Sequence, residues 1–292
     1  MTACKTVALE KCHDPEKGID RNVFSFLVFL AILLFAPAIK NLVPIWYTNS
    51  DYSHGFFVIP LSLYYIWLKR DELRRIEKRP TWLGLPLFCI SVAVYLVSYI
   101  TRFHTLTNAS ILAVLLSLSL FVGGRRLTGK LIPPIFFLIF MFPIPSAYYV
   151  QMTYPLKLMI TNISSVLISL MGVPVYREGN LLFLSSTQLE VAEACSGIRS
   201  LYSYMMLGCV FAVMVRRWRN KILLIISTIP LALFVNIVRV TTTGILANYF
   251  GARVAQGFFH EFSGLILFAV GFFLLVGEYV LISSRWDYTA AR

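Results

Sequence analysis

The sequence predicts an all-α polytopic membrane protein, and three observations support this fold class. Hydrophobic residues make up 58% of the 292 residues, charged residues make up 14%, and the mean hydropathy is +0.74. A chain this apolar cannot cover itself with a water-soluble surface, so a lipid bilayer is the expected solvent. Apolar stretches of about 20 residues, the length that crosses the hydrocarbon as a helix, recur along the chain. The net charge of +12 comes from short basic clusters between these stretches, which argues against nucleic-acid binding.

About eight of these stretches are candidate transmembrane helices. They lie near residues 23–43, 54–68, 82–100, 107–122, 131–150, 198–215, 221–247 and 260–282. Residues 1–22 are polar and mixed in charge, so we expect a disordered cytoplasmic tail without a secretory signal. No internal repeat or low-complexity linker is found, and residues 23–292 are expected to form a single transmembrane domain.

Basic residues between the spans predict the orientation, because positively charged loops are retained in the cytoplasm. With the N-terminus inside, 19 of the 26 Lys and Arg residues are cytoplasmic. They belong to the tail, the Lys69–Arg79 loop, the clusters around Arg125 and Arg217, and the C-terminus. Eight spans then return the C-terminus to the cytoplasm, so both ends of the chain are expected inside.

The stretch from 151 to 197 is the longest that does not span, and it is expected outside. Leu156–Met171 has apolar residues at helical spacing with polar residues between them, which indicates a helix lying in the membrane interface. The residues from Val173 to Leu184 resemble two short strands about Glu178-Gly179-Asn180, a β-hairpin. This segment leads directly to a cysteine.

Topology separates the five cysteines. Cys4 and Cys12 fall in the tail, Cys89 and Cys209 lie within spans, and Cys195 is at the outer face. A lone external cysteine has no intramolecular partner, which leaves a buried inert thiol, an intermolecular bridge or a nucleophile. Its position at the start of the sixth span favours a nucleophile, because the backbone N–H groups and the helix dipole there favour a thiolate. Arg199, one turn further on, could add to that field.

Arg239 and His260 are expected at the same outer depth as Cys195. A charge inside a span is costly, so Arg239 should face protein or water, with Asn236 on the same helical face to orient it. Snorkelling or a structural ion pair is the alternative for Arg239. His260 opens the eighth span and can carry protons near neutral pH, although a single interfacial histidine can also be a hydrogen-bonded bystander.

Other polar residues give weaker signals. His54, at the start of the second span, could contact substrate or merely mark the helix entrance. Glu190 and Glu193 could pair with Arg239 or Arg199, or lie in water. Cys12-His13 with Cys4 is too sparse for a metal site, and no Gly-rich phosphate loop or His-Glu-x-x-His motif occurs. We therefore expect no metal and no cofactor.

Five short motifs resemble those of the exosortase/archaeosortase family. They are Asp51-Tyr-Ser-His-Gly-Phe-Phe-Val-Ile-Pro, Phe142-Pro-Ile-Pro, Glu193-Ala-Cys-Ser-Gly-Ile-Arg-Ser, Asn236-Ile-Val-Arg and His260-Glu-Phe-Ser-Gly. Each motif is short, but their order, spacing and placement on the predicted spans are together specific. The resemblance covers about residues 23–282, nearly the whole chain.

The resemblance implies a multispanning cysteine protease or transpeptidase of the bacterial inner membrane, with its active site at the periplasmic face. Its expected partners are membrane lipid and exported proteins with a PEP-CTERM signal, which comprises a Pro-Glu-Pro-type motif, a transmembrane helix and a short basic tail. Matched residue by residue, Cys195 corresponds to the family's proposed nucleophile, Arg239 to its arginine and His260 to its third active-site residue.

Supporting or substrate-binding roles are expected for Glu193, Ser196, Gly197, Arg199, Asn236 and His54. The extra C-terminal domain of some exosortases is expected to be absent here, which leaves a separate accessory protein open.

Two other classes of function stay open at this stage. In a transporter or channel, Arg239, His54 and His260 would line a polar pathway. A non-enzymatic assembly factor for polysaccharide export would use the outer segment to bind a partner. Neither alternative requires a reactive Cys195.

Overall fold

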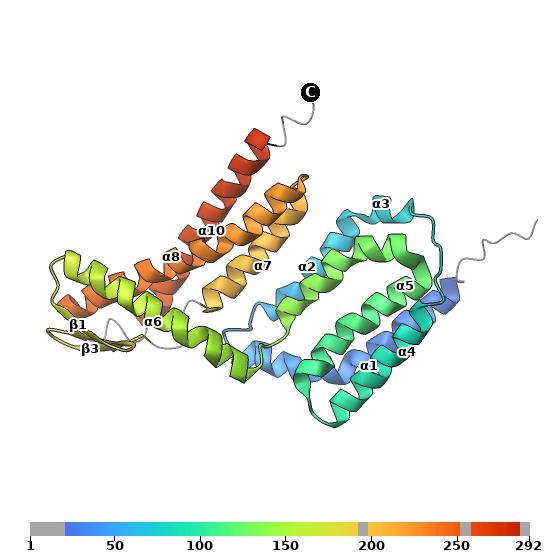
Figure 1. Cartoon of the computed structure of the whole chain (residues 1–292), viewed down its shortest axis with the longest axis horizontal. Coiled ribbons are helices and arrows are strands. Elements are labelled where there is room, and N and C mark those ends of the chain that lie inside the picture. The colour runs from blue at the N-terminus through green and yellow to red at the C-terminus, as the bar shows by residue number, and fades with distance from the viewer. Residues whose placement is uncertain (1–20, 192–197, 252–257, 287–292) are drawn as a thin grey trace, which may run out of the picture. The chain divides into compact units, whose positions relative to one another are not determined.

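The computed structural model describes the backbone of residues 21–191, 198–251 and 258–286, and their side chains except those of 21–28, 31–32, 258–263 and 285–286. Most of the described chain is helical, with one small β-sheet (Figure 1). It falls into two compact units. The first comprises the described residues up to Pro44 together with Ile59–Ile139, and the second comprises Ile45–Val58 together with the described residues from Phe140 onward.

The first unit is built from apolar helices. They are α1 (Arg21–Thr48) and α2 (Gly55–Leu68), which both extend into the second unit, then α3 (Arg70–Arg74), α4 (Gly84–Ile100) and α5 (His104–Phe137). Tyr95 of α4 is 2% exposed, and its hydroxyl donates to the carbonyl oxygen of Leu34 in α1 at 2.8 Å. The ring of Tyr95 also packs edge-on against Phe35. One aromatic residue therefore joins α4 to α1.

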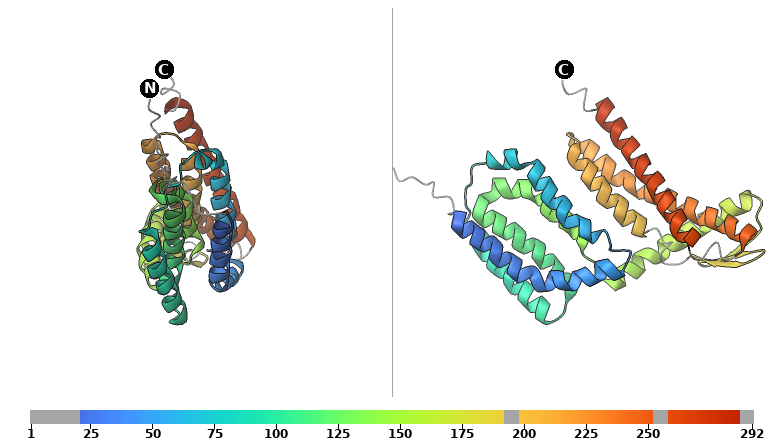
Figure 2. Two further views of the ribbon diagram at one scale, coloured as in Figure 1. Left: turned by 90° about the vertical axis from the view of Figure 1, so that its right-hand side faces the viewer. Right: turned by 180° about the vertical axis from the view of Figure 1, so that it is seen from behind.

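Helix α5 reverses direction at Gly124. This residue has φ 75° and ψ −178°, a conformation essentially restricted to glycine. The hydroxyls of Ser119 and Thr128 lie 3.1 Å apart, whereas nine residues of straight helix would separate them by about 13.5 Å. The two parts of α5 accordingly run alongside each other in both Figure 1 and Figure 2. The expected span 107–122 is the part before this bend.

The expected span 131–150 is wrong as a single helix. Helix α5 ends at Phe137, a 3₁₀ turn covers Leu138–Met141, and α6 does not begin until Ser146. The physical reason is the Phe142-Pro-Ile-Pro sequence, because proline lacks the N–H that a helix interior needs and disfavours helical geometry in the residue before it.

Among the described residues, fewer helices have the length and composition of a full span than the sequence predicts. Within the described residues, three helical stretches are long and apolar enough to cross a membrane, namely His104–Met141, Trp218–Phe250 and Gly264–Ser284. Gly55–Leu68, Gly84–Ile100 and Ile198–Met214 are apolar but shorter than the roughly 20 residues of a full span. These findings support a helical membrane protein, while the count of eight spans stays a prediction.

The second unit contains the remaining elements. They are α6 (Ser146–Leu170), β1 (Val175–Glu178), β2 (Leu181–Leu184), β3 (Gln188–Glu190), α7 (Ile198–Met214), α8 (Trp218–Phe250) and α10 (Phe258–Trp286). Helices α7, α8 and α10 lie side by side, and each runs opposite to the one before it (Figures 1 and 2). Gly208 of α7 allows a close approach to α8, since a Cβ there would lie 2.5 Å from Cγ2 of Thr228.

The predicted hairpin is confirmed. Val175 pairs with Leu184 and Glu178 with Leu181, which leaves Gly179-Asn180 as the turn. The prediction missed β3, which pairs with β2 in an antiparallel sheet of order β1-β2-β3. The helix expected at Leu156–Met171 exists as α6 but begins earlier, at Ser146, because Pro145 ends the irregular segment.

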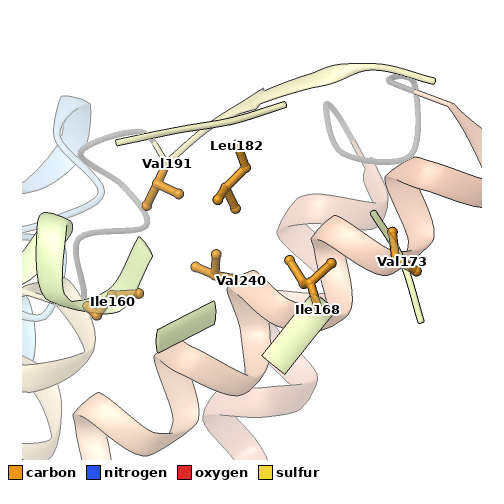
Figure 3. Packing of buried hydrophobic residues seen from close by; sticks show 6 residues of the cluster. All are labelled: Ile160, Ile168, Val173, Leu182, Val191 and Val240. Carbon is orange, nitrogen blue, oxygen red and sulfur yellow. The ribbon is translucent and has the colours of Figure 1, made fainter. Parts of the chain in front are cut away.

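The sheet lies over α6 and α8, and a small core forms between them. Figure 3 shows its six buried residues, Ile160, Ile168, Val173, Leu182, Val191 and Val240. Ile160, Ile168 and Leu182 are fully buried. Val191, the last described residue before position 192, is 1% exposed and belongs to this core.

Substitution of Gly124 tests the bend in α5. In Gly124→Ala the added Cβ would lie 1.8 Å from the carbonyl oxygen of Arg79 at an unfavourable φ, so we expect destabilisation of about 1–3 kcal/mol. The control is Gly129→Ala in the same helix, where a Cβ meets nothing within 4 Å. Thermal unfolding in detergent should show a lower midpoint for Gly124→Ala only, and equal midpoints would contradict the bend.

Candidate active site

The structure describes part of the site that the sequence predicts. Cys195, with its neighbours Glu193, Ser196 and Gly197, lies outside the described residues. The backbone of His260 is described in the first turn of α10, but its side chain is not. Arg239, Asn236, Arg199 and His54 are described in full. They fall into two groups within the second unit.

The first group surrounds Arg239 on α8. Its partly buried guanidinium lies against α10, since a Cβ built on Gly264 would be 3.2 Å from Nη2 and 3.3 Å from Cζ of Arg239. Asn236, one helical turn earlier, is 1% exposed. His260 precedes Gly264 by four residues, which is about one turn of α10. The fourth and fifth motifs therefore meet where α8 packs on α10.

The second group centres on Arg199 at the start of α7. Its Nε lies 2.5 Å from Oδ1 of Asp51, and the other carboxylate oxygen accepts a hydrogen bond from the Tyr149 hydroxyl at 3.1 Å. The Arg199 side chain is 38% exposed and that of Asp51 is 19% exposed. The carboxylate offsets the positive charge of Arg199, so Arg199 contributes less to any field at Cys195 than its sequence position suggests.

The turn that carries Asp51 is built by local hydrogen bonds. The Asn49 side chain accepts the Asp51 N–H at 2.9 Å, an arrangement typical of an Asx turn. Tyr52 is buried, and its hydroxyl accepts the Ile144 N–H at 3.2 Å. The first motif thus contacts the Phe142-Pro-Ile-Pro motif, although 92 residues separate Tyr52 from Ile144 in sequence.

His54 occupies the end of the same turn, immediately before α2. Its Nε2 donates to the carbonyl oxygen of Phe140 at 3.1 Å, and its ring lies 5.2 Å from that of Tyr202 in α7. Tyr202 also packs edge-on against Phe140. These contacts give His54 a structural partner on each side, and its expected role as a substrate contact stays a prediction.

Two acidic residues bear on the expected ion pairs. Glu190, expected to pair with Arg199 or Arg239 or to lie in water, is exposed in β3, which agrees with the last alternative, and its carboxylate accepts a hydrogen bond from the Asn180 side chain at 3.3 Å. Arg199 pairs with Asp51, which sequence reasoning did not single out. The only available signal was the position of Asp51 at the head of the first motif. Within the described part of the chain, no group of three or more His, Cys, Asp or Glu side chains could hold a metal ion.

The fold and this arrangement define an α-helical membrane protein in which an arginine of one long apolar helix meets a histidine-bearing helix. The chain belongs to the transmembrane exosortase family, whose model (Exosortase_EpsH) matches residues 46–277. All five motifs lie inside this range. No curated protein and no solved structure matches the chain.

The protonation of His54 gives a testable pH dependence. Burial lowers the pKa of His54 from its usual value of 6.5 and outweighs the Phe140 carbonyl and the Asp51 carboxylate, which raise it. A group with a lower pKa in the folded state stabilises the fold above its unfolded pKa, and this stability is lost as the pH falls through the folded value.

Thermal midpoints in detergent should therefore fall between about pH 7.5 and pH 5.5. In His54→Gln, which retains an N–H donor but does not titrate, the fall should be smaller. Identical pH profiles for the two proteins would show that His54 is not responsible.

Proposed function

We propose that this chain is a membrane-embedded cysteine protease or transpeptidase that cleaves PEP-CTERM-type signals of exported proteins. The site is proposed at the outer face of the bacterial inner membrane, with both termini of the chain cytoplasmic. The observation that carries the proposal is the close approach of Arg239 to Gly264, one helical turn from His260. Family membership supports the reaction class.

The packing register of α7 on α8 supports the proposal that Cys195, Arg239 and His260 lie at a similar depth in the membrane. Gly208 lies opposite Leu224, since a Cβ there would be 3.3 Å from the Leu224 carbonyl oxygen. The two helices are antiparallel. About ten residues before Gly208 in α7 is Ile198, and about ten residues after Leu224 in α8 is Phe234, so Ile198 and Phe234 lie at the same level. Arg239 is then only about 7.5 Å further along α8 than the level of Ile198, and Ile198 follows Cys195 by three positions in the sequence.

In the proposed first step, the Cys195 thiolate attacks the carbonyl carbon of the scissile peptide bond and forms a C–S bond. Arg239 stabilises the oxyanion that develops on the carbonyl oxygen, an effect that is stronger in a water-poor site than in bulk water. Collapse of the tetrahedral intermediate breaks the C–N bond. His260 donates a proton to the departing amine, which leaves a thioester on Cys195.

In the second step, water or an amine attacks the thioester carbonyl, and His260 takes the proton of the attacking group. Breakage of the C–S bond regenerates the thiolate. Attack by water yields a carboxylic acid and corresponds to proteolysis, whereas attack by an amine yields a new amide and corresponds to transpeptidation.

The nucleophile is tested by co-expression with an exported reporter that carries a PEP-CTERM tail. Cys195→Ala should leave the reporter at its uncleaved size, because an alanine side chain cannot form the thioester. Immunoblots of reporter size, normalised to the amount of enzyme in the membrane, provide the measurement. Wild-type processing by Cys195→Ala would show that Cys195 is not the nucleophile.

The position of Arg239 is tested without removal of its charge. In Gly264→Ala the new methyl group would displace the guanidinium by a few tenths of an ångström, and we expect reporter cleavage to slow about three- to ten-fold. The matched control is Gly277→Ala in the same helix, where a Cβ meets nothing within 4 Å. Equal rates for both variants would mean that cleavage does not depend on where Arg239 lies.

A further inference from the structure

The turn Asp51–His54 contacts the beginning of α7 at two positions. Asp51 binds the Arg199 guanidinium, and the His54 ring lies beside the Tyr202 ring. Residues three apart lie on the same face of a helix, so both contacts act on one face of the first turn and a half of α7. Ile198, the first residue of α7, follows Cys195 by three positions in the sequence.

The turn itself is held at several points. The Asn49 side chain accepts the backbone N–H of Asp51, the Tyr52 hydroxyl accepts the Ile144 N–H, and His54 donates to the Phe140 carbonyl. The Tyr149 hydroxyl of α6 donates to Oδ2 of Asp51, so the carboxylate has a partner on each oxygen. Asp51 is therefore a fixed acceptor, and Arg199 is oriented by it.

The ion pair between Asp51 and Arg199 can orient the Arg199 side chain, but it adds little to the stability of the fold. The pair is partly exposed, and exposed ion pairs contribute little net stability because water and salt screen them. A charged hydrogen bond at Nε does, however, restrict the planar guanidinium and the helix turn that bears it. Cys195 precedes Arg199 by four residues, a length of chain that reaches at most about 14 Å.

We propose that Asp51 is a positioning residue for the proposed nucleophile: it holds Arg199, and through Arg199 it fixes the start of α7 to which Cys195 is attached. This inference rests on the proposed cysteine mechanism. Asp51 itself touches no reacting atom. Because Arg199 binds Asp51, Arg239 is the cation that we assign to stabilise the oxyanion.

The test measures initial rates of reporter cleavage by the purified full-length enzyme in detergent, as a function of reporter concentration. Asp51→Asn keeps the shape of the side chain but removes its charge, and kcat should fall about ten- to hundred-fold with KM changed less than about two-fold. Asp51→Glu restores the carboxylate and should recover part of kcat. The control is Asp71→Asn, which alters an exposed aspartate beside Arg70 and should leave kcat unchanged.

A double substitution separates positioning from general damage. If Asp51 acts through Arg199, Asp51→Asn combined with Arg199→Gln should be no slower than the slower single variant. Multiplied losses, a wild-type kcat in Asp51→Asn, or a loss confined to KM would each overturn the proposal. Loss of cleavage in Cys195→Ala together with a normal Asp51→Asn would reject only the positioning role, whereas activity in Cys195→Ala would reject the mechanism on which it rests.

Discussion

The break between α5 and α6 is the constraint on which the second unit depends. Backbone groups released from a helix must find partners in an apolar environment, because an unsatisfied group there costs several kcal/mol. Side chains from one short segment satisfy three of them. Trp46 donates to the Met141 carbonyl at 2.8 Å, His54 donates to the Phe140 carbonyl, and the Tyr52 hydroxyl accepts the Ile144 N–H. The proline-containing break thus determines where the segment preceding α2 must lie.

That segment in turn connects the break to the site. Tyr52 and His54 form hydrogen bonds with the break. Asp51, in the same turn, contacts Arg199 of α7 and Tyr149 of α6. A separate contact joins Arg239 of α8 to Gly264 of α10. The first three motifs and the last two therefore form two clusters, and α7 packed against α8 relates them within one unit. Short motifs far apart in sequence are brought into one arrangement by these contacts.

An arginine within an apolar helix is expensive unless it is sheltered or solvated. Arg239 is partly buried, and a Cβ built on Gly264 of α10 would lie 3.2 Å from its Nη2. Glycine at this position lets the two helices approach while the guanidinium remains between them.

The sequence by itself determined the helical membrane class, the hairpin about Gly179-Asn180 and the motifs that define the family, because hydropathy, turn residues and short motifs are local properties. The break before Ser146 follows from the local prolines, which hydropathy alone does not register. Only the tertiary structure decided the reversal at Gly124, the third strand and the pairing of Arg199 with Asp51. These features depend on long-range contacts: Asp51 and Arg199 are 148 residues apart, and no local pattern distinguishes Asp51 from other carboxylates as the partner of Arg199. Packing of distant segments makes that choice, because it brings the Asp51 carboxylate within hydrogen-bond distance of the guanidinium.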